Sequence, residues 1–165
     1  DTISNEKLDI SITIVSETKK PIYRSGINKN DLLCYTGTLG TCKKDLEKLF
    51  TNKKISKKSK FIKPKLNADF FYEISKYVTA SLDISDGLFF ELERLSKSSK
   101  VGFDFFTEIN ESIGISGEEY EMLFSFNQKN QKKIAKIAKK YNIKLNIFAK
   151  AVTGKYKTTS KNHHF

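Results

Sequence analysis

This sequence has few residues of the types that crosslink a chain or carry it into a membrane. Its 165 residues include no tryptophan, one methionine, two prolines and two cysteines. Cys34 and Cys42 have no companion ligands at zinc spacing, so we interpret them as reduced thiols of a cytoplasmic protein. No apolar run approaches the roughly 20 residues that cross a bilayer, and the opening residues do not resemble a signal peptide. We therefore expect a cytoplasmic protein without membrane contact.

Arginine is scarce although the chain is basic. The net charge is +11, yet Arg24 and Arg94 are its two arginines. Most of the excess lies in residues 43–65, where ten lysines stand against Asp45 and Glu47. Such a run can attract nucleic acid, membranes or anionic metabolites. Specific nucleic-acid readers rely on guanidinium forks and interleaved aromatic rings, so we interpret the run as a solvated surface with no specific nucleic-acid role.

Apolar residues are frequent enough for a core, since hydrophobic types make up 38% of the chain. Their spacing predicts strands over 8–16, 32–36, 79–84, 101–106, 120–126 and 143–152, and helices over 45–50, 67–78, 87–99 and 130–142. After Pro64 the order reads roughly αβαββαβ. We expect an α+β fold: a partial N-terminal sheet domain over 1–60, then a C-terminal α/β sandwich over 61–165 with a mixed, mostly antiparallel sheet.

Two carboxylates flank a serine in the stretch DISDG, between the predicted strand 79–84 and the helix that follows it. These residues are Asp83, Ser85 and Asp86. Mg²⁺ prefers carboxylate and phosphate oxygens, and the N–H groups after Asp86 would face an anion at the start of the helix. The turn therefore suits a metal-bound nucleotide. Alternatively, Ser85 or Asp86 merely caps the helix, and the spacing leaves both interpretations open.

A second acidic stretch, SGEEYEML, contains Glu118, Glu119 and Glu121. Taken alone, it fits a turn with solvated carboxylates equally well. The common phosphate loops, G-x-x-x-x-G-K-[ST] and G-x-G-x-x-G, are absent from the sequence. Both histidines lie within the last four residues, which argues against a histidine-centred triad. By itself, Arg24 is typical of a surface residue before a turn.

Four stretches, in order, resemble the thiamine-monophosphate kinase family of the aminoimidazole-ribonucleotide-synthetase-like superfamily. SLDISDGL and SGEEYEMLF resemble its paired signature, S-[IL]-D-[IV]-S-D-G-L and G-G-E-D-Y-E-L-L-F. IYRSGINKNDLLCYTGTLG resembles the family's R-S-G-A stretch, and FIKPKL resembles its R-P-x-P-R-[LV] element. The opening Asp-Thr resembles the end of a G-G-D-T motif. The resemblance covers nearly the whole chain.

The resemblance implies a phosphotransferase that uses ATP and Mg²⁺ to convert thiamine monophosphate to thiamine diphosphate. It also implies a homodimer formed through the N-terminal domain. Carried over position by position, it implies Mg²⁺ ligands at Asp1, Asp83 and Asp86, ATP contacts at Arg24 and Ser85, and a thiamine contact at Glu118. Asp83 and Asp86 would be the catalytic pair.

The sequence departs from the family pattern at three places. Ser116 replaces the first glycine of G-G-E-D, and Glu119 replaces its aspartate. Asn162 stands where the family has an aromatic residue near the thiamine. Family members are also much longer, so we expect this chain to begin inside the N-terminal domain and to be inactive alone.

Two alternatives remain open. The chain could be a sister enzyme of the superfamily that uses ATP on a different acceptor, although the functional cysteine motifs of such enzymes do not match Cys34 and Cys42. It could also be a Lys-rich, non-enzymatic binding module built around residues 43–65, whose binding to nucleic acid would depend steeply on salt.

Overall fold

A computed structural model describes residues 10–160, and a five-stranded sheet lies at its centre. The strands are β1 (Asp31–Thr36), β2 (Val78–Asp83), β3 (Val101–Phe105), β4 (Met122–Asn127) and β5 (Leu145–Thr153). They lie in the order β2-β4-β1-β5-β3, and each neighbouring pair is antiparallel. The predicted α+β class is confirmed. The sheet within residues 10–160 is antiparallel throughout rather than mixed.

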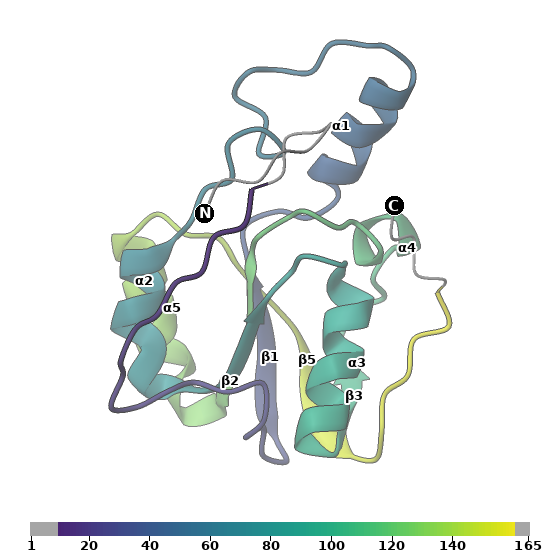
Figure 1. Cartoon of the computed structure of the whole chain (residues 1–165). Coiled ribbons are helices and arrows are strands. Elements are labelled where there is room, and N and C mark those ends of the chain that lie inside the picture. Colours follow the sequence, from purple (N-terminus) through teal and green to yellow (C-terminus); the bar gives the residue numbers. More distant parts are fainter. Residues whose placement is uncertain (1–9, 161–165) are drawn as a thin grey trace.

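Helices cover both faces of this sheet (Figure 1). Helix α3 (Leu88–Ser99) lies on one face, and α2 (Ala68–Ile74) and α5 (Gln131–Lys140) lie together on the other. Helix α1 (Thr41–Phe50) projects beyond one end of the sheet. The short helix α4 (Glu111–Gly114) and the 3-10 turns η1 (Ser75–Tyr77) and η2 (Gln128–Asn130) complete the helices. Within the described residues, no helix is long and apolar enough to span a membrane.

Strand β1 divides the core in two because successive side chains of a strand face opposite sides of a sheet. Leu33 packs into the cluster that includes Leu88, Leu92 and Leu95 of α3. Leu32 and Cys34 pack into the other cluster, with Phe70 and Ile74 of α2 and Ile134 and Ala138 of α5. Both cysteines are buried free thiols. Burial raises the pKa of Cys34 to about 12, so this thiol is protonated at neutral pH.

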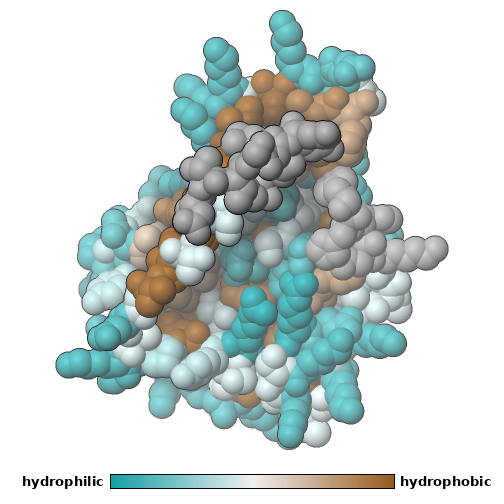
Figure 2. Space-filling model, in the orientation of Figure 1, coloured by the Kyte–Doolittle hydropathy of each residue, from teal (hydrophilic) through white to brown (hydrophobic). Residues whose placement is uncertain are grey.

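The predicted strand over 8–16 is wrong for its described part. Residues 10–16 adopt no regular structure, and Ile10, Ile12 and Ile14 are 69%, 79% and 86% exposed. Figure 2 shows apolar side chains at the surface along this segment. Alternation is necessary for a half-buried strand but not sufficient, because a strand also needs a neighbour for its N–H and C=O groups. The five-stranded sheet ends at β2 and β3, and neither edge pairs with this segment.

Strand β1 lies in the middle of the sheet, between β4 and β5. The sheet therefore joins a strand from before residue 60 to four strands from after it. The domain boundary expected near residue 60 falls in the connection between α1 and α2.

Candidate functional site

The acidic turn lies where β2 ends and α3 begins. Asp83 is the last residue of β2, and Ser85 and Asp86 are half-buried in the turn. Gly87, rather than Ser85 or Asp86, occupies the N-cap position of α3, with φ 111°. The interpretation of Ser85 or Asp86 as the cap is therefore wrong. A positive φ at this position favours glycine, and the glycine leaves the neighbouring side chains available for other contacts.

Glu91 is one of two residues of this site that the sequence did not reveal. It lies in the first turn of α3 and is 1% exposed. Its Oε1 accepts hydrogen bonds from the backbone N–H of Asp86 (3.2 Å) and from Ser85 Oγ (3.4 Å). Its Oε2 is buried without a hydrogen-bond partner. An acidic residue in a first helical turn is common because of the helix dipole, so its sequence position alone did not reveal its role.

Arg94 joins the two carboxylates of the turn. Its Nη1 donates to Glu91 Oε1 at 2.6 Å, and its Nη2 donates to Asp86 Oδ2. The hydrogen bond to Glu91 raises the pKa of Arg94, burial opposes this, and Asp86 adds to the increase. The acidic turn is therefore partly neutralised by a cation from its own helix. The signal in the sequence was the spacing of Glu91 and Arg94, which places the two side chains on one face of α3.

The second acidic stretch lies directly against the turn. Glu118 donates its N–H to the carbonyl of Ser85 at 2.7 Å, and Tyr120 donates to the carbonyl of Ile84 at 2.9 Å. Ile84 in turn donates to the carbonyl of Glu121 at 2.8 Å. These three backbone bonds join the two motifs, which are about thirty residues apart in the sequence, into one structure.

Glu118 and Tyr120 both adopt left-handed backbone conformations, with φ of 56° and 50°. This conformation costs energy for residues with a side chain. Glu118 is exposed, and the Tyr120 hydroxyl donates to its Oε2 at 2.6 Å. That hydrogen bond, followed by burial, raises the pKa of Tyr120 to about 12. The Glu118 carboxylate is thus presented to solvent beside the acidic turn.

Glu119 points away from solvent and caps α1. It is 1% exposed and accepts from the N–H of Gly40 at 2.7 Å and of Cys42 at 3.2 Å. Lys60 Nζ lies 2.6 Å from Glu119 and 3.1 Å from Glu121. Burial alone would lower the pKa of Lys60, but its contacts with both glutamates outweigh burial and raise it. For Lys60, the prediction of a solvated lysine is therefore wrong.

The two departures from the family motif belong to one hydrogen-bonded unit. Ser116 Oγ donates to Glu119 Oε1 at 2.6 Å and accepts from the N–H of Lys43 at 3.2 Å. Together they satisfy N–H groups at the start of α1, which otherwise have no partner within a helix. This carboxylate cap also explains why α1 begins at Thr41 rather than at the predicted residue 45.

The oxygen donors of the turn fit Mg²⁺ in kind, since this ion prefers carboxylate oxygens. The structure places Asp83 and Asp86 at the same turn. Glu91, which accepts a hydrogen bond from the Asp86 N–H, also has a buried Oε2 without a hydrogen-bond partner. Within residues 10–160, no group of three or more acidic, histidine or cysteine side chains is placed to hold a metal. Asp1 and Asn162 lie outside the described residues.

Arg24 is not brought to the acidic turn within this chain. It is exposed, and its carbonyl accepts from Ser99 Oγ at 3.4 Å, at the far end of α3 from Asp86. With 12 residues at a rise of 1.5 Å each, α3 separates the two places by about 18 Å.

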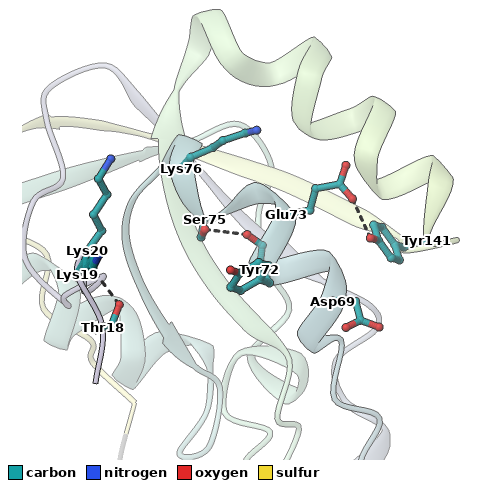
Figure 3. A pocket seen from close by; sticks show the side chains of 9 residues that line it. All are labelled: Thr18, Lys19, Lys20, Asp69, Tyr72, Glu73, Ser75, Lys76 and Tyr141. Atoms are coloured by element: carbon teal, nitrogen blue, oxygen red, sulfur yellow. Dashed lines mark hydrogen bonds between the residues drawn. The ribbon is translucent and has the colours of Figure 1, made fainter. Parts of the chain in front are cut away.

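Two cavities lie outside the acidic turn. The first lies beside α2, and the second lies beside Tyr120. The first cavity, of about 700 Å³, opens between residues 18–20 and α2. In Figure 3, Glu73 accepts from the Tyr141 hydroxyl while Lys20 and Lys76 lie farther along the opening. A second cavity of about 550 Å³ is lined by Tyr120 and Met122, close to Glu118, and by apolar side chains such as Leu66.

The curated proteins that resemble this chain include several thiamine-monophosphate kinases. No family model matches the chain. The curated thiamine-monophosphate kinase of Nitrosopumilus maritimus is 30% identical over 94% of this chain and 56% of its own length. That of Aquifex aeolicus is 29% identical over 73% of this chain and 47% of its own length. The chain spans about half the length of the curated relatives it matches.

Solved structures share the fold. The structure of AaThiL complexed with AMPPCP and TMP matches with a TM-score of 0.68 at 21% identity, covering 86% of this chain and 53% of that one. HypE of E. coli, a hydrogenase maturation protein, matches with a TM-score of 0.67 at 11% identity, covering 90% and 54%. The fold is thus of a class that is found in ThiL and in HypE. Within that class, the sequence likeness to the curated relatives is specific: the chain belongs to the thiamine-monophosphate kinase family.

Proposed function

We propose that the full-length protein to which this chain belongs transfers a phosphoryl group from ATP to thiamine monophosphate, giving thiamine diphosphate. One observation carries the proposal. The two motifs that define the family resemblance are joined by three backbone hydrogen bonds, from Glu118 to Ser85, from Tyr120 to Ile84 and from Ile84 to Glu121. A nucleotide site at the first motif and an acceptor site at the second would therefore be neighbours.

The proposed division of roles follows the chemistry of each side chain. Asp83 and Asp86 would hold Mg²⁺, which when bound neutralises phosphate charge. Ser85 would contact ATP. The exposed Glu118 would face the thiamine, whose thiazolium ring carries a positive charge. The acceptor is already an anionic phosphate, so the site needs alignment and charge neutralisation rather than a strong general base.

Other parts of the proposal rest on the family resemblance. Asp1 would bind Mg²⁺, and Arg24 would contact ATP. Because Arg24 lies at the far end of α3 from Asp86, this contact requires either that the nucleotide extends along α3 or that Arg24 reaches a nucleotide bound to a second chain. We further propose a cytoplasmic homodimer that forms through an N-terminal domain. Because β1 lies inside the sheet, we propose that the boundary of that domain lies before β1 rather than near residue 60.

The decisive experiment compares two aspartate variants of the full-length protein. Asp86→Asn should weaken binding of Mg·ATP, measured calorimetrically, by at least about tenfold. Asp104→Asn is the matched control, because Asp104 is an exposed carboxylate on the edge strand β3, away from the turn. Unchanged Mg·ATP affinity in Asp86→Asn would remove the metal role of the turn.

Product analysis separates the alternatives. The proposed kinase converts thiamine monophosphate and Mg·ATP to thiamine diphosphate. A sister enzyme would consume ATP only with another acceptor, and a binding module would not consume ATP at all. Formation of a discrete nucleic-acid complex at physiological salt would favour the binding module.

A further inference from the structure

We propose that Arg94 is an exchangeable counter-ion of the site. Its guanidinium neutralises Asp86 when no metal ion is bound and turns to a phosphate of the nucleotide when Mg²⁺ takes its place. This inference rests on the proposed function, because it assumes that a metal-bound phosphate occupies the acidic turn.

The anchoring of Arg94 is the first argument. Nη1 is bonded to Glu91, whose side chain is 1% exposed, whereas Nη2 is bonded to Asp86, whose side chain is 20% exposed. The Arg94 side chain itself is 39% exposed. One end of the fork is therefore fixed in the interior, and the other end lies where solvent and ligands can reach it.

The unpartnered oxygen of Glu91 is the second argument. A buried carboxylate requires a nearby cation or hydrogen-bond donors, yet Glu91 Oε2 has no hydrogen-bond partner. Loss of Arg94 from this place would leave a negative charge in the interior. Glu91 therefore keeps the guanidinium at the turn even after Asp86 has been taken over by a metal ion.

The geometry of the guanidinium is the third argument. A divalent cation competes with a single positive charge for the same carboxylate, because attraction grows with charge. Displacement from Asp86 frees the N–H groups of Nη2 while Nη1 remains held. A planar fork of this kind binds phosphate oxygens in a fixed orientation. The freed end of Arg94 is thus placed beside the phosphate that the metal ion brings.

The test measures Mn²⁺ binding to the full-length protein by electron paramagnetic resonance, without nucleotide, and Mg·ATP binding by calorimetry. In Arg94→Gln, loss of the competing cation should tighten Mn²⁺ binding by about tenfold, and loss of the phosphate contact should weaken Mg·ATP binding by about tenfold. Arg94→Lys keeps the charge without the fork, so it should restore the wild-type Mn²⁺ affinity and restore Mg·ATP affinity only in part. Lys97→Gln is the control, since Lys97 lies on the same helix and pairs with Glu93.

The outcomes separate the inference from a structural role. Opposite changes in the two affinities support the exchange. In Arg94→Gln, unchanged Mn²⁺ affinity, or equal weakening of both ligands, overturns it. If Arg94→Gln does not fold, Arg94→Lys decides: weaker Mg·ATP binding at wild-type Mn²⁺ affinity supports the exchange, and unchanged Mg·ATP affinity overturns it. If the wild-type protein binds no Mg·ATP, the proposed function fails. Tighter Mn²⁺ binding in Arg94→Gln would then still support the competition between Arg94 and metal for Asp86.

Discussion

Gly117 packs against the carbonyl oxygen of Ser85 with no space for a side chain between them. A Cβ added to Gly117 would stand 2.8 Å from that oxygen, and the atom it meets is backbone, which cannot swing aside. The absence of a side chain at this one position therefore allows the two acidic motifs to touch.

We expect Gly117→Ala to separate the motifs and to weaken binding of both substrates. The methyl group must push residues 84–86 away from Glu118, and misplacement by about 1 Å can cost on the order of a hundredfold in rate. Steady-state kinetics of the full-length protein would show this as a loss in kcat together with raised KM values. Ser112→Ala, in the exposed first turn of α4, should leave kinetics unchanged. Wild-type kinetics for Gly117→Ala would contradict the close packing.

Lys60→Met should destabilise the protein by about 3 kcal/mol, because removing one partner of a buried ion pair leaves the other charge uncompensated. Here the uncompensated groups are Glu119 and Glu121. Urea unfolding measures the change in the free energy of unfolding. Lys58→Met removes an exposed lysine of the same segment and should change stability little. Equal stabilities for the two variants would show that Lys60 is solvated after all.

Tyr120 should ionise at unusually high pH. Its hydrogen bond to Glu118, together with burial, raises its pKa from 10.0 to about 12. A raised pKa means that the contribution of this bond to stability is complete below pH 10 and is lost as the pH rises towards 12. The difference in ultraviolet absorbance between wild type and Tyr120→Phe isolates this group among the seven tyrosines. A difference titration centred near pH 10 would mean that the bond to Glu118 does not form in solution.

The 165-residue chain alone should form no thiamine diphosphate. Each Mg²⁺ requires six oxygens in a nearly octahedral arrangement, and residues 10–160 contain no group of three side chains suited to a metal. The measurement compares the chain with the full-length protein under saturating thiamine monophosphate and Mg·ATP. Comparable turnover by the two proteins would show that the metal site is complete without further residues.

The sequence predicted elements well where one face of a segment is buried. Helix α3 follows the spacing of Leu88, Leu92 and Leu95, all fully buried, and the strands β2 to β5 lie within two residues or so of their predicted bounds. The prediction of secondary structure was wrong where a segment needed a pairing strand from elsewhere in the chain. The segment over 10–16 has the alternation of a strand but no neighbour in the described sheet.

The same division applies to the site. The resemblance to family motifs pointed to Asp83, Ser85, Asp86 and Glu118, whose roles in binding metal and substrates stay predictions. It did not reveal Glu91 or Arg94, because a glutamate and an arginine on a helix are typical of solvated faces. Only tertiary structure shows that Glu91 is buried and that Arg94 is directed to the turn.

The central place of β1 has a consequence for how the protein is made. β1 is the first strand of the described chain, yet its partners β4 and β5 are the last two. During synthesis on the ribosome, the first edge of β1 stays unpaired until β4 has emerged, and its second edge stays unpaired until β5 has emerged near the end of the described chain. Contacts between segments so distant in the sequence carry a high entropic cost of loop closure, and this cost slows folding. A nascent chain with β1 waiting unpaired exposes a hydrophobic strand to other chains, so its yield in cells should depend on chaperones that shield it until β5 arrives.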